Sequence, residues 1–186
     1  MSKRVNIMVG RFQPFTKGHL KCVEAVWRQT GTKTVLVMID TPTSKINLSH
    51  PFSSELLLPI CEELFKHYNF IEKKIILAKN ANIVDINETL NGLGYEICSW
   101  VCGSDRYDSY KSMVDRYGKE INLPEDFKLI EIKRGTQDIS ATQVREALIN
   151  KDYLTFAKLM PFMPLSFVIK YPLFDILSKE ILKTYK

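Results

Sequence analysis

The sequence has few histidines and no cysteine pair spaced as in a zinc or redox motif. It contains 3 histidines, and its 4 cysteines, Cys22, Cys61, Cys98 and Cys102, include no C-x-x-C pair. A metal site rich in histidine is therefore not expected, and no dedicated protein metal site is predicted. We interpret the cysteines as reduced thiols in a cytoplasmic protein rather than as a disulfide framework.

The chain also lacks long apolar runs, internal repeats and low-complexity segments. No run approaches the roughly 20 apolar residues that cross a bilayer, so neither a membrane span nor a signal peptide is expected. The net charge of +5 and the pI of about 8.9 favour anionic ligands. This excess is too small to indicate nucleic acid as a partner.

Apolar and β-branched runs alternate with helical patterns along most of the chain. Strands are expected at Val5–Val9, Lys33–Asp40, Lys73–Ala78, Ile97–Cys102 and Phe127–Ile132. Helices are expected at Leu20–Arg28, Leu56–Phe65, Asp85–Leu93 and Tyr107–Tyr117, and from Ser140 onward. This order predicts an α/β fold with a doubly wound, five-stranded parallel sheet and helices on both faces.

The stretch GRFQPFTKGH, from Gly10 to His19, joins the first strand to the first helix. Gly10 and Gly18 permit a tight turn and a close approach of the backbone. A helix N-terminus with Arg11, Lys17 and His19 beside it is a suitable binding site for phosphates. The alternative interpretation is a surface loop that is merely basic.

This stretch resembles the T/H-x-G-H signature of the nucleotidyltransferase superfamily. The six residues before the signature, GRFQPF, are most similar to the corresponding segment of archaeal and phage-type nicotinamide-nucleotide (NMN) adenylyltransferases. Those enzymes usually have histidine at the position of Thr16, whereas phosphopantetheine adenylyltransferases have threonine. The resemblance implies a Rossmann-like fold over roughly Val5 to Leu148.

A second stretch, ISATQVR, lies at Ile139–Arg145. Ser140 followed by Gln143 forms a capping box, which by itself predicts only a well-capped helix. The stretch also resembles the I-S-x-T-x-x-R signature of the same superfamily. That resemblance implies that Ser140, Thr142 and Arg145 bind the terminal phosphates of a nucleotide.

Two further segments resemble adenylyltransferase motifs less closely, and Trp100 is a candidate residue for the acceptor. Gly103-Ser104-Asp105, followed by Arg106, matches the G-x-D after the fourth strand, although a plain turn would also explain it. Lys45 and the segment Pro51–Glu55 resemble the N-P-F-T-x-x-E-R segment of archaeal NMN adenylyltransferases. This chain has Leu56 where that segment has arginine. Trp100 could stack on a nicotinamide ring of the acceptor, but its place in an apolar strand favours a core position.

The resemblance implies a set of roles for these residues. The expected catalytic residues are His19, Thr16 and Arg145. The residues expected to bind nucleotide or phosphate are Gly10, Arg11, Phe12, Gln13, Lys17, Gly18, Lys45, Gly103, Asp105, Arg106, Ser140 and Thr142. Mg²⁺ is expected to arrive with the nucleoside triphosphate, without a protein cage of its own.

The function implied is transfer of AMP from ATP to NMN with release of pyrophosphate. The alternatives are a cytidylyltransferase that uses CTP, a phosphopantetheine adenylyltransferase, and a non-catalytic nucleotide-binding regulator. Residues 1–150 are expected to form the nucleotidyltransferase domain. Residues 151–186 are expected to form a helical extension that packs on this domain. The sequence does not decide whether the protein forms a homo-oligomer.

Overall fold

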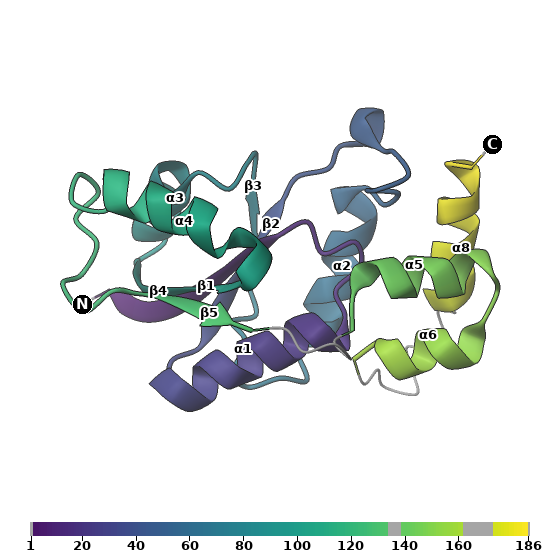
Figure 1. Ribbon diagram of the computed structural model, residues 1–186, viewed down its shortest axis with the longest axis horizontal. Coiled ribbons are helices and arrows are strands. Elements are labelled where there is room, and N and C mark those ends of the chain that lie inside the picture. The colour runs from purple at the N-terminus through teal and green to yellow at the C-terminus, as the bar shows by residue number, and fades with distance from the viewer. Residues whose placement is uncertain (1, 134–138, 162–172, 186) are drawn as a thin grey trace.

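Five parallel strands form the centre of the protein in the computed structural model, which describes residues 2–133, 139–161 and 173–185 (Figure 1). The strands lie in the order β3-β2-β1-β4-β5, and every neighbouring pair is parallel. Their bounds are β1 Lys3–Gly10, β2 Thr34–Ile39, β3 Ile76–Ala78, β4 Tyr95–Gly103 and β5 Lys128–Ile132. The predicted five-stranded parallel sheet is confirmed.

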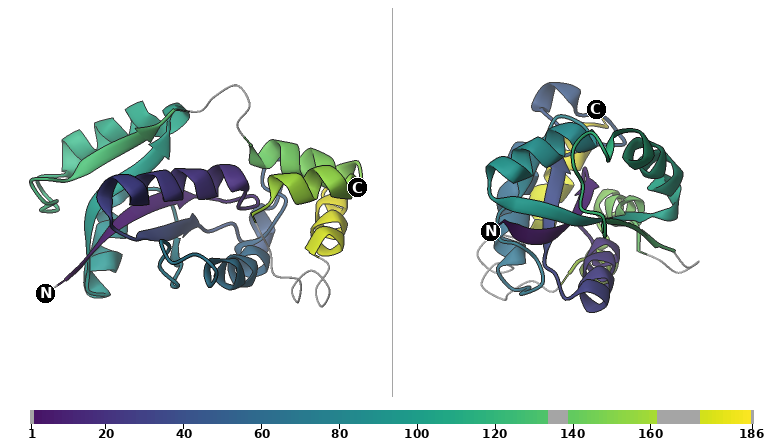
Figure 2. Two further views of the ribbon diagram at one scale, coloured as in Figure 1. Left: turned by 90° about the horizontal axis from the view of Figure 1, so that it is seen from below. Right: turned by 90° about the vertical axis from the view of Figure 1, so that its left-hand side faces the viewer.

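Helices cover both faces of this sheet (Figure 2). Their bounds are α1 Lys17–Thr30, α2 Ser54–Phe65, α3 Ile83–Gly92, α4 Ser104–Tyr117, α5 Ala141–Ile149, α6 Tyr153–Leu159 and α8 Leu173–Lys183, with a short 3₁₀ helix η1 at Thr43–Lys45. Side chains from α1, α2, α5, α6 and α8 share one hydrophobic cluster, and those from α3 and α4 share a second. The fold is therefore a Rossmann-like α/β sandwich of three layers.

Strand β1 lies at the middle of the sheet and is buried on both faces. Met8 packs into the first cluster, whereas Ile7 and Val9 pack into the second. A strand covered on both sides is expected to be apolar at nearly every position, as the run Val5–Val9 is. Beside it the strand order reverses, because β1 pairs with β2 on one edge and with β4 on the other. Ligands of such sheets bind at this point, outside the carboxyl ends of the strands.

Some element boundaries differ from the expected ones for local physical reasons. Helix α1 begins at Lys17 instead of Leu20, because Thr16 caps it. Helix α4 begins directly after Gly103, so Asp105 lies in its first turn, where the helix dipole favours a carboxylate. Strand β3 is shorter than expected because it is an edge strand that pairs only with β2.

The described part of the C-terminal extension is helical and contributes to the first hydrophobic cluster. Phe156 of α6 and Leu173, Leu177 and Ile181 of α8 are buried together with Val144 of α5. The extension thus packs against the helix that carries the second sequence motif. The division of the chain at residue 150 stays a prediction.

Candidate active site

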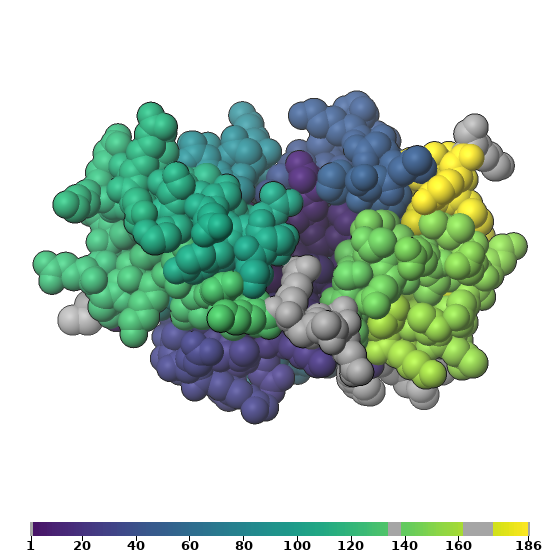
Figure 3. All heavy atoms as spheres, viewed as in Figure 1, coloured from purple at the N-terminus to yellow at the C-terminus, as the bar shows by residue number. Residues whose placement is uncertain are grey.

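A cleft opens at the carboxyl ends of β1 and β4 and consists of two adjoining cavities of about 570 and 420 Å³. Both volumes lie in the range of small-molecule sites. The residues that line both cavities are Arg11, Phe12, His19, His50, Asp105 and Arg106. In the space-filling view the purple residues after β1 lie deep between the teal residues of α4 and the green residues of α5 (Figure 3).

The loop after β1 is held in shape by an aromatic cluster. Phe12 has a positive φ of 48° and is 3% exposed. Its ring packs edge-on against Phe15 and His19, with centroids 5.5 and 5.3 Å away. A Cβ on Gly10 would lie 3.1 Å from the Phe12 ring, so the glycine allows the ring to fold back over the end of the strand. Phe12 and Gly10 therefore shape the base of the cleft.

Gln13 fastens this loop to the segment that precedes α2. Its side-chain amide donates to the carbonyl of Phe52 at 2.7 Å, and its side-chain carbonyl accepts from the N–H of Phe52 at 3.0 Å. Gln13 is 4% exposed, and its amide is fully engaged in this pairing. The side chain thus positions the loop, and because Gln13 also lines the larger cavity, its predicted contact with the nucleotide stays a prediction.

Replacing Gln13 with leucine is expected to lower the free energy of unfolding by about 1–3 kcal/mol, because it leaves the N–H and C=O of buried Phe52 unpaired. Denaturant titration of both proteins measures this difference. Gln29→Leu, on the exposed end of α1, is the matched control and should change stability by no more than about 0.5 kcal/mol. Equal stability of the wild-type protein and Gln13→Leu would contradict the positioning role.

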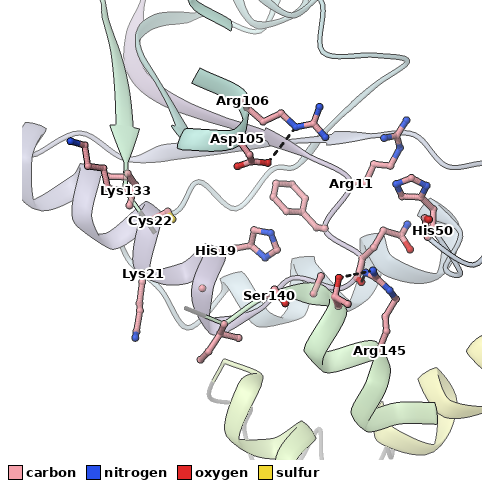
Figure 4. A pocket seen from close by; sticks show the side chains of 18 of the residues that line it. Arg11, His19, Lys21, Cys22, His50, Asp105, Arg106, Lys133, Ser140 and Arg145 are labelled. Carbon is pink, nitrogen blue, oxygen red and sulfur yellow. Dashed lines mark hydrogen bonds and ion pairs between the residues drawn. The ribbon is translucent and has the colours of Figure 1, made fainter. Parts of the chain in front are cut away.

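Thr16 and His19 form a reciprocal capping box at the start of α1. Thr16 Oγ1 accepts from the N–H of His19 at 3.5 Å, and His19 Nδ1 accepts from the N–H of Thr16 at 3.0 Å. Because Nδ1 is an acceptor here, a neutral His19 carries its proton on Nε2. The same contacts that start the helix thus select the tautomer of the imidazole, which points into the cavity (Figure 4).

The structure corrects the role predicted for Thr16. Its side chain is fully buried, and its hydroxyl lies 3.1 Å from Nδ1 of His19 instead of facing either cavity. It therefore cannot donate to a bound phosphate in this conformation. Threonine is suited to this place because a hydroxyl both caps the helix and holds the ring of His19.

Gly18 brings the two sequence motifs into direct contact. A Cβ on Gly18 would lie only 2.2 Å from the backbone carbonyl oxygen of Ile139. Only glycine leaves room for the chain to enter α5 at this point. The first turn of α1 and the N-terminus of α5 are therefore packed backbone to backbone at the rim of the larger cavity.

Helix α5 presents its capped N-terminus and one arginine to this cavity. Ser140 accepts from the N–H of Gln143 at 3.3 Å, and the side chain of Gln143 accepts from the N–H of Ser140 at 2.9 Å, so the predicted capping box is confirmed. Arg145 donates to the carbonyl of Gln13 at 3.0 Å and to Thr142 Oγ1 at 3.0 Å. Partial burial lowers the pKa of the Arg145 guanidinium from its usual value.

Arg145→Lys is expected to lower kcat/KM by about tenfold or more, because an ammonium group cannot hold Gln13, Thr142 and a phosphate at once. Steady-state kinetics with a varied triphosphate measures this loss. The control is Arg28→Lys, because Arg28 pairs with Glu24 on the exposed side of α1. Wild-type kinetics for Arg145→Lys would remove this arginine from the site.

The cleft has a strongly cationic lining. Its larger cavity is bordered by Arg11, Lys21, Arg106, Lys133 and Arg145, whereas Asp105 is the only carboxylate among the described residues that line it. Asp105 lies 3.6 Å from the guanidinium of Arg106, so even this negative charge is paired. In Figure 4 the guanidinium groups of Arg11 and Arg106 lie beside the cavity, whereas the side chains of Lys21 and Lys133 extend outward from its edge. Clustered cations and a helix N-terminus are suited to a polyphosphate chain.

Gly103, Asp105 and Arg106 border the smaller cavity, and their contact with a nucleoside, which the G-x-D resemblance implies, stays a prediction. Gly103 ends β4 and precedes the first turn of α4. Lys79 and Asn80, which precede α3, form part of the same wall. The larger cavity therefore provides most of the positive charge, and the smaller one lies between α4 and the segment that precedes α3.

Three of the predicted binding residues lie elsewhere. Lys17 donates to the carbonyl of Lys158 at 2.6 Å, at the end of α6, and so ties the first motif to the C-terminal extension. Lys45 is exposed on η1 and borders neither cavity. Trp100 is 0% exposed and stacks on Tyr110 with centroids 4.0 Å apart, so it belongs to the core and presents no face to an acceptor.

Sequence reasoning missed His50, Lys21 and Lys133 as cleft residues. Lys133 follows β5 and His50 follows β2, so both lie beyond the carboxyl end of a predicted strand, a position that could have identified them. Lys21 lies one turn after Gly18 on the predicted helix. Their side chains reach the cleft only because the parallel sheet brings these ends together.

The described residues offer little protein coordination for a metal ion. No three His, Cys, Asp or Glu side chains among them lie close enough to hold one. Asp105 is the single carboxylate on the cleft within the described part of the chain. This donor set suits a divalent ion held mainly by phosphate oxygens and not one resident in a protein cage.

None of the helices in residues 2–133, 139–161 and 173–185 is long and apolar enough to span a bilayer.

Several solved structures share this fold at low sequence identity. A nicotinic acid mononucleotide adenylyltransferase from Plasmodium falciparum, complexed with APC, matches with a TM-score of 0.61 and 16% identity, over 93% of this chain and 98% of that one. A putative nicotinate-nucleotide adenylyltransferase from Vibrio parahaemolyticus has a TM-score of 0.59 and 13% identity, over 92% and 95% of the two chains. A bifunctional NMN adenylyltransferase/ADP ribose pyrophosphatase from Francisella tularensis, complexed with AMP and a Mn ion, has a TM-score of 0.61 and 17% identity, over 100% of this chain and 53% of that one.

Sequence comparison identifies the family. No curated protein matches the chain. The family model described as cytidylyltransferase-like matches residues 7–147, which include both sequence motifs. The predicted superfamily and the predicted enzyme class, nucleotidyltransferase, are confirmed. The chain belongs to the cytidylyltransferase-like family of the nucleotidyltransferases.

Proposed function

We propose that this enzyme transfers AMP from ATP to NMN, with pyrophosphate as the second product. The observation that carries the proposal is the pair of adjoining cavities that share His19, since a reaction between two nucleotides needs two sites that meet at one point. The names of the structural neighbours, which include NMN and nicotinic acid mononucleotide adenylyltransferases, support the same class of acceptor. Nicotinic acid mononucleotide is thus the closest competing acceptor.

The larger cavity is suited to the triphosphate. Arg11, Lys21, Lys133 and Arg145 would neutralise the β- and γ-phosphates, and the N-terminus of α5 would add its N–H groups. The smaller cavity would then hold the acceptor nucleotide beside α4. Residues shared by the two cavities would bring the acceptor phosphate and the α-phosphate together, which lowers the barrier through orientation.

The transfer needs no covalent bond to the protein. An oxygen of the acceptor phosphate attacks the α-phosphorus of ATP, the bond from that phosphorus to the bridging oxygen of the β-phosphate breaks, and pyrophosphate leaves with the electron pair. His19 donates from Nε2 to the phosphate oxygens on which charge develops. The Thr16 contacts keep Nδ1 as an acceptor, so this donor is already in place before substrate binds.

A divalent cation is part of the proposal only as the partner of the triphosphate. Asp105, which lines both cavities, would contact the ion or one of its waters. The ion would supply charge neutralisation for the phosphate oxygens. A neighbour that holds AMP together with a Mn ion supports a divalent cation at this kind of site, and Mg²⁺ stays our prediction.

Cytidylyl transfer to an alcohol phosphate is the second candidate, because the matching family model is named after cytidylyltransferases. It would use the same phosphate-binding residues and differ only in the base and the acceptor. Phosphopantetheine adenylyl transfer and a non-catalytic role remain alternatives. Four expectations remain predictions: that the protein binds no nucleic acid, that it binds no membrane, that it can form a homo-oligomer, and that it is located in the cytoplasm.

Incubation of the protein with ATP or CTP and each acceptor in turn tests the proposal. The acceptors are NMN, nicotinic acid mononucleotide and phosphopantetheine, and both pyrophosphate and the coupled product are measured. We expect NAD and pyrophosphate in equal amounts from ATP and NMN, and little pyrophosphate without an acceptor. A product only with CTP, or only with another acceptor, would replace the proposed substrates, and no product with any pair would favour the non-catalytic role.

A further inference from the structure

His50 occupies a fixed position on the cleft, although none of the sequence motifs includes it in a role. It lies on the loop after β2 and lines both cavities. Its N–H donates to the carbonyl and to Oδ1 of Asn47, each at 3.0 Å, and the N–H of Asn47 donates to the carbonyl of His50 at 3.2 Å. Two residues later, Phe52 is held by Gln13. The backbone of His50 is therefore anchored on both sides.

The imidazole of His50 lies among cations. Figure 4 shows it beside the guanidinium of Arg11, on the same side of the cavity as Arg145. Burial and the charges of these two arginines lower the pKa of His50 below its usual 6.5. In the ligand-free protein His50 is therefore mostly neutral at physiological pH.

Besides Arg11 and Arg145, other ionisable side chains on the cleft contribute to the electrostatic potential at His50. Among the described residues, the other ionisable groups that line the two cavities are His19, Lys21 and Cys22 on α1, Lys79 before α3, Cys102 on β4, Asp105, Arg106 and Tyr110 on α4, and Lys133 after β5. Asp105 is the only carboxylate among them. Within the described part of the cleft, the charges around His50 thus oppose its protonation until an anion binds.

We propose that His50 is a phosphate-binding residue that takes up a proton when the triphosphate enters the cleft. The inference rests on the proposed function, because it assumes that the phosphate chain binds between Arg11 and Arg145. A polyphosphate carries several negative charges into this space and reverses the sign of the local potential. His50 then becomes a cation that donates a charge-assisted hydrogen bond to a phosphate oxygen.

The direction of the pH dependence follows from this change. The pKa of His50 is below 6.5 without ligand, and under the proposal it rises when the anion is bound. Between these two values the protein takes up a proton as it binds, so nucleotide affinity increases as the pH falls through that window. Above the ligand-bound pKa, His50 stays neutral in both states and this contribution is absent.

Isothermal titration calorimetry with ATP, in two buffers that differ in protonation enthalpy, tests the inference. The variants are His50→Gln, His50→Lys and, as the matched control, His67→Gln. His67 is exposed and lines a separate cavity with Lys66 and Tyr68. The thermal melting of each variant is recorded first, to establish that it folds.

At about pH 6.5 we expect the wild-type protein and His67→Gln to bind ATP with proton uptake. His50→Gln should bind about tenfold more weakly with less uptake, and its defect should shrink at about pH 8.5. His50→Lys carries a permanent charge, so it should bind at least as tightly as wild type at the higher pH without the extra uptake.

Equal proton uptake and equal affinity in the wild-type protein and His50→Gln would overturn the inference and leave the proposed function intact. A wild-type protein that binds neither ATP nor CTP would overturn the proposed function, and the inference with it. Loss of affinity in His50→Gln with unchanged proton uptake would assign the uptake to another group and would also refute the proposal. Titration with tripolyphosphate in place of ATP should reproduce the effect, since the base is not involved.

Discussion

His19→Ala is expected to yield a folded enzyme whose turnover is lower by about 10²–10³, the usual effect of removing one donor to developing charge. The imidazole lines both cavities and carries its proton on Nε2, because Nδ1 accepts from Thr16. The same substitution removes half of the capping box, which costs about 1 kcal/mol of stability. Turnover under saturating substrates and thermal melting should therefore be measured together.

The matched control is His67→Ala, because His67 is exposed and lies outside the cleft. It should retain wild-type turnover and stability. If His19→Ala melts within a few degrees of wild type and also turns over at the wild-type rate, the histidine has no part in the transfer. A large loss of stability would instead assign His19 mainly to the cap.

Gly18→Ala should damage the site without touching a substrate. The new methyl group would lie 2.2 Å from the carbonyl oxygen of Ile139, so the chain that enters α5 must move away. We expect a loss of about 1–3 kcal/mol in stability from the overpacking. Turnover should fall by about 10²-fold, because the N-terminus of α5, which we propose to bind phosphate, moves relative to His19.

Gly92→Ala is the control for this substitution. Gly92 ends α3, and a Cβ there would meet nothing within 4 Å, so alanine should be neutral or slightly stabilising. Denaturant titration and steady-state kinetics on both variants separate a general effect of glycine replacement from the contact with Ile139. Wild-type kinetics in Gly18→Ala would show that the two motifs do not depend on each other.

The sequence was sufficient for those features that depend on neighbouring residues. Apolar runs located all five strands, and the Ser140–Gln143 spacing predicted the capped start of α5. Gly103 and Asp105 were placed at the cleft because parallel strands end at the same edge of the sheet. These predictions needed only periodicity, capping chemistry and the topology rules.

Contacts between distant residues could not be predicted in this way. Lys17 was expected to bind phosphate, but its ammonium is held by Lys158, 141 residues later. The amide of Gln13 is likewise occupied by Phe52, 39 residues later. Residue type shows what a side chain can bind, whereas packing decides which partner it meets.

The two walls of the cleft are supported by hydrophobic clusters on opposite faces of the sheet, and this arrangement determines how the cleft responds to substitutions in the core. Helix α5, with Arg145, is packed in the first hydrophobic cluster through Val144, whereas α4, with Asp105, is packed in the second through Tyr110. The walls of the cleft are thus supported by separate hydrophobic clusters, to each of which the central sheet contributes residues. A substitution that loosens one core should shift one wall and leave the other in place, so that the two walls of the cleft can change independently in evolution.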